Sequence, residues 1–427
     1  MRNSGAKRLY GKVLAANDNS KNQVYLGGDF KALNILPHEE ILIDFNSTAG
    51  SKRDRAKAKI NFSWVNTSGQ YPAPHAQLIL YPKYPEVRFS GFLRGCLQAP
   101  KDVMKVRDSN RVLFLGITES GRILGYAAAA FSPIAQEFIT TRGLQEVGVI
   151  YEIPLTASGD SRTELISTLR DVYLKCWIES KKLEADGTSR PYAATNGGGY
   201  TLEAELGITP NSYAESDFLG WEIKQYRVNN FEKYRARSAV SLFTPEPTGG
   251  YYKDQGVRSF VDRYGYPDKK GRLHRRNFGG VYRCKKTYHK DTQLRLELLG
   301  YNESKNIIED MAGGIALMDQ NKEVAAIWNY PSILEHWNRK HAKAAYVPSL
   351  FRNPPPEYCF GPKVFLCEGT DFSRFLRALV NSSVYLDPAI KVISEPTTKI
   401  QVKRRNQFRI NHKHLNLLYE KSEIVTL

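Results

Sequence analysis

An aspartate, a glutamate and a lysine lie close together near the middle of the chain, at Asp217, Glu222 and Lys224. The stretch GWEIKQYRV predicts a β-strand, on which residues two apart project from the same face. We therefore expect Glu222 and Lys224 to share a face, with Asp217 at the preceding bend. Converging carboxylates need a cation to stay ionised, and hard oxygen ligands suit Mg²⁺. With a lysine to orient or deprotonate a water, the pattern predicts metal-dependent phosphodiester hydrolysis.

This D-x4-E-x-K string is not specific by itself. Two other E-x-K pairs occur, Glu179–Lys181 and Glu303–Lys305, and neither has an aspartate five residues before its glutamate. The alternative is an edge strand with a surface Glu–Lys pair. The residues around the string must decide between the two interpretations.

The charge of the chain favours a polyanionic partner. The 427 residues include 61 Lys and Arg against 44 Asp and Glu, a net charge of +17. Residues 1–150 hold 20 basic and 12 acidic side chains, so the excess is shared along the chain and not confined to a tail. We expect double-stranded DNA as the partner, because no basic amphipathic helix for a membrane stands out. A basic protein without such a partner is the alternative.

Composition excludes several classes of protein. With 41% hydrophobic and 25% charged residues, the chain has enough apolar residues to form cores, so it is not disordered. No apolar run approaches the length of a membrane span, and the first residues lack the apolar core of a secretory signal. Five cysteines without a C-x-x-C pair argue against disulfides and a cysteine zinc site. We expect a cytoplasmic protein.

The chain is too long for one ordinary domain, and its texture changes near residue 160. Short apolar runs between Gly, Asn, Asp and Pro predict a β-rich first domain of barrel or sandwich type. The following stretch predicts a long helix, with Ser161 as a candidate N-cap and apolar residues at helical spacing: Leu165, Leu169, Val172 and Cys176. A shorter helix (YTLEAELG) and mixed signals predict an α+β or α/β second domain.

The residues around the triplet resemble a known nuclease family. Three consecutive segments are similar to a core of the MutH-like PD-(D/E)XK nucleases, in particular the MvaI/BcnI restriction endonucleases. They are Gly199-Tyr-Thr-Leu-Glu203-Ala-Glu-Leu-Gly207, a loop through Asn211, and Asp217-Phe-Leu-Gly220-Trp-Glu222-Ile-Lys224. The resemblance implies that Asp217 and Glu222 bind the metal, that Lys224 serves the attacking water, and that Glu203 is an accessory acid.

The resemblance extends from about Ser161 to the C-terminus. Some relatives have a base-reading histidine before the terminal F/L-R-I string, where this chain has Arg404, Arg405 and Gln407. The base-reading roles of the family therefore do not transfer exactly to this chain, and Arg405 and Gln407 are kept as candidate DNA contacts. The basic stretch YPDKKGRLHRRNF (266–278) predicts either a DNA-clamping loop, through Arg272 and Arg275, or a solvated one.

The N-terminal part resembles the EcoRII N-terminal effector domain, a DNA-binding pseudobarrel. The strings KVLAANDNSKNQVYL (12–26) and YPKYPEVRFSGFLRG (81–95) carry this resemblance, which implies two DNA-recognition arms. Asn and Gln side chains pair with adenine edges, and Arg pairs with guanine or phosphate. The candidate DNA contacts are Asn17, Asp18, Gln23, Arg88 and Arg94, each of which could instead be an ordinary turn or surface residue. The basic cluster SKRDRAKAK (51–59) is either a solvated or a phosphate-contacting loop.

These features together predict two domains. An EcoRII-N-like effector domain spans residues 1–157, and an α/β, MutH-like nuclease domain of restriction-endonuclease type spans residues 158–427. The resemblance implies a Mg²⁺-dependent type II restriction endonuclease that acts as a monomer in host defence, at a short site such as CCWGG, with a cognate DNA methyltransferase encoded nearby. The alternatives are a MutH-like nicking enzyme of mismatch repair and a non-catalytic, sequence-specific DNA-binding regulator.

Overall fold

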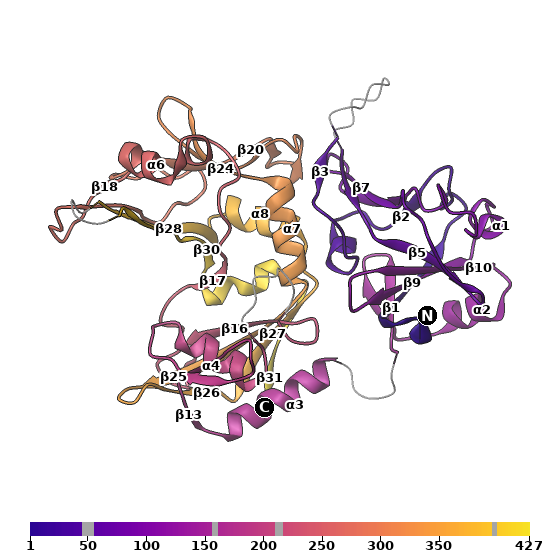
Figure 1. The fold of residues 1–427 in the computed structure, drawn as a ribbon, viewed down its shortest axis with the longest axis horizontal. Coiled ribbons are helices and arrows are strands. Elements are labelled where there is room, and N and C mark those ends of the chain that lie inside the picture. The colour runs from indigo at the N-terminus through magenta and orange to yellow at the C-terminus, as the bar shows by residue number, and fades with distance from the viewer. Residues whose placement is uncertain (45–54, 156–160, 210–216, 395–398) are drawn as a thin grey trace. The chain divides into compact units, whose positions relative to one another are not determined.

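The computed structural model describes residues 1–44, 55–155, 161–209, 217–394 and 399–427. Part of the basic cluster (51–54), the predicted boundary at 156–160 and the loop residue Asn211 lie outside these ranges. The chain divides into two compact units, residues 1–160 with 307–311, and residues 161–306 with 312–427 (Figure 1). No described helix is both long enough and apolar enough to cross a membrane.

The N-terminal unit is built from two sheets (Figure 1). The first has seven strands in the order β11 (Gln145–Val147), β12 (Ile150–Ile153), β1 (Ala6–Leu14), β9 (Arg111–Thr118), β10 (Ile123–Ala128), β5 (Phe62–Asn66) and β6 (Gly69–Pro72). The second has five strands in the order β2 (Val24–Tyr25), β8 (Glu86–Ser90), β7 (Gln77–Tyr81), β4 (Ala56–Lys59) and β3 (Leu42–Ile43). Its helices are η1 (Arg2–Ser4), η2 (Lys31–Asn34), α1 (Lys101–Met104) and α2 (Pro133–Thr140). The β-rich prediction for this region is thus confirmed at the level of secondary structure.

Aromatic side chains join these two sheets. Phe62 and Trp64 belong to β5 of the first sheet, and their ring centroids lie 5.1 Å apart. The Phe62 ring also lies 5.0 Å, centroid to centroid, from the ring of Phe89 on β8 of the second sheet. The Trp64 indole Nε1 donates a hydrogen bond to the Phe92 carbonyl at 2.6 Å. All four rings are buried, so their packing supplies a large share of the apolar core of this unit.

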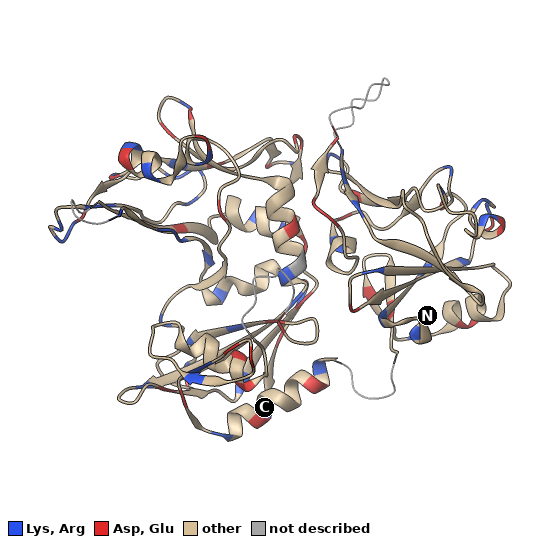
Figure 2. Ribbon diagram, in the orientation of Figure 1, with Lys and Arg blue, Asp and Glu red and all other residues tan. Residues whose placement is uncertain are grey.

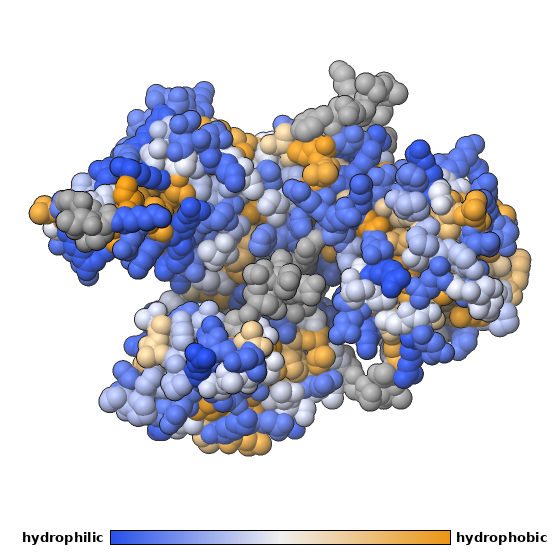
Figure 3. Space-filling view, viewed as in Figure 1, coloured by the Kyte–Doolittle hydropathy of each residue, from blue (hydrophilic) through white to orange (hydrophobic). Residues whose placement is uncertain are grey.

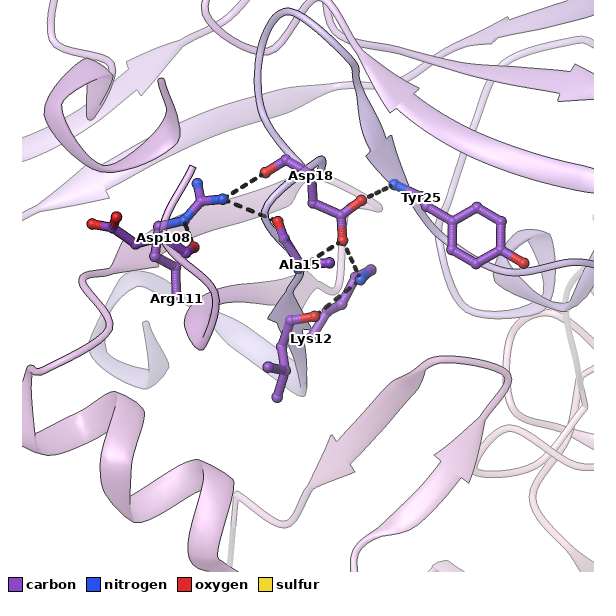
Figure 4. Close-up of polar contacts among 7 residues, drawn as sticks. Lys12, Ala15, Asp18, Tyr25, Asp108 and Arg111 are labelled. Atoms are coloured by element: carbon purple, nitrogen blue, oxygen red, sulfur yellow. Dashed lines mark hydrogen bonds and ion pairs between the residues drawn. The ribbon is translucent and has the colours of Figure 1, made fainter. Parts of the chain in front are cut away.

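A buried ion pair fixes the loop between β1 and β2 (Figure 4). Lys12 Nζ lies 2.8 Å from Asp18 Oδ2, and both residues are buried. The Asp18 carboxylate also accepts the backbone N–H groups of Ala15 and Tyr25, at 3.1 and 2.8 Å. The buried Arg111 guanidinium donates to the carbonyls of Ala15 and Asp18, at 3.2 and 3.1 Å. Because each of these buried charges is paired or hydrogen-bonded, the loop is held in one conformation.

The C-terminal unit contains the strand predicted to carry the triplet. Its first sheet has the order β13 (Trp177–Glu179), β26 (Glu357–Phe360), β25 (Lys343–Arg352), β27 (Lys363–Glu368) and β31 (Lys421–Thr426), and β16 (Glu222–Arg227) pairs in parallel with β25. Helices α3 (Ser161–Leu174) and α4 (Gly197–Glu205) pack on one face of this sheet. Their buried residues, among them Leu165, Leu169 and Leu202, share an apolar core with Ile223 and Val347 of the sheet.

A second sheet of this unit has the order β17 (Val240–Phe243), β30 (Asn406–Ile410), β28 (Val384–Ile393), β19 (Arg275–Gly279) and β18 (Tyr266–Pro267), with β29 (Gln401–Lys403) beside β28. The remaining strands of this unit are β20 (Arg295–Leu299), β23 (Gly314–Met318), β24 (Val324–Asn329), β14 (Lys181–Leu183), β15 (Ser189–Pro191) and β21 (Tyr301–Asn302). Strand β22 (Ile307–Ile308) belongs to residues 307–311, which are part of the N-terminal unit. The remaining helices are α5 (Tyr251–Asp254), α6 (Gly256–Tyr264), α7 (Tyr330–His341), α8 (Phe372–Val380) and η3 (His412–Leu418). This mixture confirms the α/β character predicted for the second domain.

The long helix predicted from residue 161 is shorter than expected. Leu165, Leu169 and Val172 are buried on α3 as their spacing predicts, but the helix ends at Leu174. Cys176 follows with a φ of 58°, a left-handed conformation that redirects the chain into β13. The prediction that Cys176 extends the helical stripe is therefore wrong, because pairing with β26 takes over from helical periodicity.

The substitution Asp18→Ala should lower the stability of the chain by about 3–5 kcal/mol, since it leaves the Lys12 ammonium buried without its counter-charge. Denaturant unfolding measures this loss directly. The neighbouring Asn17 is exposed, and Asn17→Ala should change stability by less than about 0.5 kcal/mol. Equal effects of the two substitutions would contradict this role of Asp18.

Candidate active site

The triplet lies at the start of β16. The preceding turn is closed by two hydrogen bonds between Phe218 and Trp221, at 2.9 and 2.8 Å, and its two central residues have φ values of 49° (Leu219) and 86° (Gly220). Two positive φ angles in succession are the geometry of a tight hairpin turn. The turn brings Asp217 back to the strand, where its Oδ2 accepts the backbone N–H of Ile223 at 2.9 Å.

Glu222 is the most deeply buried member of the triplet, with only 1% of its surface exposed. Its Oε1 accepts a hydrogen bond from the Lys224 ammonium, as expected for side chains two apart on one strand face. Its Oε2 is buried and has no hydrogen-bond partner among the described residues. A buried carboxylate oxygen without a donor is costly, so this atom is a candidate metal ligand.

Helix α4 adds a third carboxylate. Burial, with the nearby charge of Asp217, raises the pKa of Glu203 to about 7. Burial, with the charge of Glu222, raises the pKa of Asp217 to about 6. These carboxyl groups therefore share one electrostatic environment and hold protons at a pH where isolated carboxyl groups are ionised. A bound cation would release those protons.

The other acidic residue of α4 has a different environment. Glu205 lies 2.6 Å from Lys175 Nζ and 2.5 Å from Lys181 Nζ. Burial opposes its ionisation, but the two ammonium groups hold its pKa below the ordinary value. The charge of Glu205 is already balanced by two lysines, whereas the pKa of Glu203 responds to the charge of Asp217. This difference agrees with the prediction that Glu203, and not Glu205, belongs with the triplet.

Lysine and carboxylate stabilise each other's charge in this site. Burial would raise the pKa of Glu222, but the positive charges of Lys224 and Lys340 hold it below the ordinary value. Burial would likewise lower the pKa of Lys224, and the charges of Glu222, Asp217 and Glu203 raise it instead. Lys224 is therefore an ammonium near neutral pH and acts as a hydrogen-bond donor.

Two residues of this site were missed by sequence reasoning, Lys340 and His341 at the end of α7. The parallel register places Glu222 opposite Ala344, a few residues after α7 ends, so the last turn of α7 lies beside the triplet. Lys340 lowers the pKa values of Glu203, Asp217 and Glu222 by its charge. No local motif marks these residues, and only the pairing of β16 with β25 could have revealed them.

His341 is completely buried beside this cluster. Its ring stacks on that of Trp337 at 4.2 Å, and its nitrogens lie 3.3 Å from the Trp337 carbonyl and 3.2 Å from the Leu242 carbonyl. Burial lowers its pKa to about 4, so the imidazole is neutral. His341 thus joins α7 to β17 behind the triplet.

The donor set fits a hard divalent cation. Among the residues that the structure describes, no three His, Cys, Asp or Glu side chains converge closely enough to form a complete metal cage. Magnesium does not need one, because it binds through one or two carboxylates and takes water and substrate phosphate oxygens for the rest. Asp217 and the Glu222 Oε2, which has no partner in the part of the chain that the structure describes, would be such ligands.

A family model covers this site. The model of the MvaI/BcnI restriction endonuclease family matches residues 166–419, which is more than half of the chain. The chain belongs to the MvaI/BcnI restriction endonuclease family. The matched residues include Glu203, Asp217, Glu222 and Lys224, so the resemblance read from the sequence is confirmed for the family. Membership gives the C-terminal unit a restriction-endonuclease-like fold.

Two solved structures are similar to the chain. The complex of restriction endonuclease MvaI with its cognate DNA substrate is 17% identical, covers 63% of this chain and 99% of that one, and has a TM-score of 0.48. MvaI in the absence of DNA is 16% identical, covers 64% and 100% of the two chains, and has a TM-score of 0.36. No curated protein matches the chain significantly.

The predicted DNA contacts within the family-matched region lie in two environments. Arg272 and Arg405 are exposed. Arg275 is instead used internally, since its Nε lies 2.9 Å from Asp268 Oδ2 and donates to Asn277 Oδ1 at 2.9 Å. Gln407 lies on β30 opposite Asp387 of β28.

In the N-terminal unit, the pairing of β2 with β8 brings together the two strings that carry the EcoRII-like resemblance. Asn17 and Arg94 are exposed, and Gln23 Nε2 donates to Ser90 Oγ at 3.5 Å. The Arg88 guanidinium donates to both carboxylate oxygens of Glu86, at 3.1 and 3.2 Å. Asp18 is buried with both oxygens engaged, so its role is to hold the loop and not to contact DNA bases.

The raised pKa values predict how the metal-free stability depends on pH. The folded chain binds protons at Asp217 and Glu203 more tightly than the unfolded chain does. The contribution of these two groups to the free energy of unfolding is therefore fully present below about pH 4 and is lost as pH rises through 6 to 7. The Tm of the metal-free protein should fall between pH 4 and pH 7, and it should fall less steeply in the Asp217→Asn variant. At pH 8, adding Mg²⁺ should raise the Tm of the wild type. Glu164→Gln, an exposed carboxylate on α3, is the control. Identical pH profiles for Asp217→Asn and the wild type would contradict the prediction.

Proposed function

We propose that the chain is a Mg²⁺-dependent type II restriction endonuclease that hydrolyses double-stranded DNA at a short specific site. The observation that carries the proposal is the buried, unpartnered Oε2 of Glu222 beside the proton-holding Asp217, within a region that matches a restriction endonuclease family. The site class that the sequence resemblance implies is CC-N-GG, with CCWGG as the candidate.

Asp217 and Glu222 would hold the metal, which when bound supplies a polarised water and a positive charge beside the phosphate. Asp217 is oriented for this by its hydrogen bond from Ile223 N, and Glu222 by its hydrogen bond from Lys224. Both carboxylates are fixed before substrate arrives, so little reorganisation is needed during the reaction.

Lys224 orients the attacking water and stabilises the negative charge that develops on the phosphoryl oxygens. Its ammonium form is maintained by the surrounding carboxylates, so donation and not proton abstraction is its role in this proposal. Glu203 has the pKa closest to neutral in the cluster, which suits an accessory group that accepts or returns a proton.

The N-terminal unit, residues 1–157 in this proposal, is an EcoRII-N-like pseudobarrel that binds DNA separately. Its DNA contacts would be the exposed Asn17 and Arg94 and the half-buried Gln23 and Arg88, on the neighbouring β2 and β8 and their loops. Asp18 positions this surface from inside. In the nuclease domain, residues 158–427, Arg272, Arg405 and Gln407 would contact DNA, and Arg275 would brace the loop that carries Arg272. The enzyme would act as a monomer in host defence, with a cognate methyltransferase protecting the host.

Plasmid cleavage tests the catalytic assignment. With Mg²⁺, the wild type should give discrete ends, and Asp217→Ala and Lys224→Ala should each lose at least about 100-fold in rate, since each removes a group from the reaction centre. DNA binding should persist in both variants. Glu205→Ala is the matched control, because this carboxylate on α4 is already paired with lysines.

The outcomes of this assay separate the alternatives. Full cleavage by Lys224→Ala would overturn the site. Stable nicks in one strand of hemimethylated DNA would favour a MutH-like repair enzyme. DNA binding with no cleavage under any metal condition would favour a non-catalytic regulator.

Binding by the full chain carrying Asp217→Ala tests the N-terminal surface. If Arg88 reads guanine, Arg88→Ala should cost about 1–3 kcal/mol of discrimination between specific and non-specific DNA. Arg122→Ala is the control, since it removes the same charge from the turn before β10 of this unit, where Arg122 donates to Gln70. Unchanged specificity in Arg88→Ala would remove it from the proposed interface.

A further inference from the structure

A leucine occupies the most exposed position that a large apolar side chain has in the described part of the chain. Leu273 is 92% exposed. It lies between β18 and β19, in a ribbon of strands that projects from the C-terminal unit (Figure 1). Figure 3 shows a small hydrophobic patch at the outer end of this ribbon. Polar residues are favoured in turns. The leucine stands out by its setting, because it lies at the tip of a basic hairpin.

The tip of this hairpin is ordered by its own hydrogen bonds. Asp268 Oδ1 accepts the backbone N–H of Lys270 at 2.7 Å, and Asp268 Oδ2 pairs with Arg275 Nε at 2.9 Å. The backbone N–H of Arg275 donates to the Arg272 carbonyl at 3.3 Å, which places Leu273 in a turn. The leucine is therefore presented by a braced turn, which reduces the entropy lost when it docks.

The base of the hairpin is also anchored. The Arg276 guanidinium donates to the carbonyls of Asp262 and Gly265 at the end of α6, at 3.2 and 2.8 Å. Lys269 Nζ lies 2.7 Å from Asp291 Oδ2 and above the ring of Tyr266. These contacts hold the hairpin that carries Leu273 against the rest of the unit.

The surroundings of Leu273 are strongly basic. Lys270, Arg272 and His274 are exposed at the tip, and Figure 2 shows Lys and Arg along the projecting strands. On the same ribbon, Lys391 of β28 lies directly opposite Lys403 of β29. Neither lysine forms an ion pair with any residue in the described ranges. Like charges facing each other across two strands are destabilising, so this surface is suited to a polyanion.

We propose that Leu273 is a wedge that inserts between base pairs of the bound DNA and bends it, while the lysines and arginines of the ribbon contact the flanking phosphates. This inference rests on the proposed function and adds a shape-reading element to it. Apolar side chains on basic elements unstack and kink duplexes in this way, and the energy of kinking depends on the base step. Leu273 would thereby favour sites with a deformable step.

Duplexes with 2-aminopurine placed at successive positions test the wedge, using the full chain with Asp217→Ala to prevent cutting. Fluorescence should rise several-fold at one step on binding, because unstacking relieves quenching. Leu273→Ala should abolish this rise and reduce the bend measured by energy transfer between the duplex ends, and Leu273→Met should retain both. Leu174→Ala, another exposed leucine of this unit, is the matched control.

The wedge would be overturned if the wild-type chain bound the duplexes without any change in fluorescence, or if Leu273→Ala gave the same signal as the wild type. It would also be overturned if Leu273→Ala lost binding to phosphatidylserine vesicles while DNA binding and bending stayed intact. Failure of the proposed function looks different, because the wild-type chain would then make no double-strand breaks at a specific site with Mg²⁺, whatever the fluorescence of the duplex shows. Lys403→Ala adds an independent check. The Lys403→Ala substitution should raise the Tm of the DNA-free protein, because it relieves the repulsion between Lys403 and Lys391. It should also weaken DNA binding and reduce the salt dependence of the binding constant.

Discussion

The burial of the Glu222 carboxylate at the start of β16 is the constraint on which the C-terminal unit depends. Parallel pairing with β25 fixes this strand, and with it the position of the Glu222 carboxylate. One of its oxygens is paired with Lys224, and the other has no partner within the described ranges. An unsatisfied buried oxygen costs about 1–3 kcal/mol. The chain tolerates this cost because α3, α4 and the sheet share a large apolar core. Packing alone therefore holds this carboxylate in place, as the proposed cation site requires.

The two units treat a buried carboxylate in opposite ways. In the N-terminal unit, Asp18 has an ammonium and two backbone N–H groups around its oxygens, so it is saturated and structural. In the C-terminal unit, one Glu222 oxygen has no partner among the described residues. Burial and the charge of a neighbouring carboxylate (Glu222 for Asp217, Asp217 for Glu203) raise the pKa values of Asp217 and Glu203 toward neutrality. Saturation gives rigidity, whereas an incomplete set of donors gives affinity for a ligand. This difference separates the two carboxylates, which look alike in the sequence.

The sequence predicts the local part of the site and misses the part made by long-range pairing. The triplet, its strand and the helix that carries Glu203 follow from spacing and turn residues over 199–228. Lys340 and His341 do not, because only the β16–β25 register brings the end of α7 beside the triplet. Cys176 continued the helical period in sequence, yet its left-handed backbone ends the stripe. Asp18 looked like an exposed turn residue, since its partners Lys12 and Arg111 lie on separate strands.

The central claim is that Asp217 and Glu222 together hold the divalent ion. Its most direct test is a crystal structure of the full chain with DNA and Mn²⁺, in which anomalous scattering locates the metal without assumptions about its ligands. We predict a peak between Asp217 and Glu222, in contact with a phosphate oxygen of the DNA and absent from the Asp217→Asn variant. A peak at any other set of residues, with none between these two carboxylates, would contradict the account.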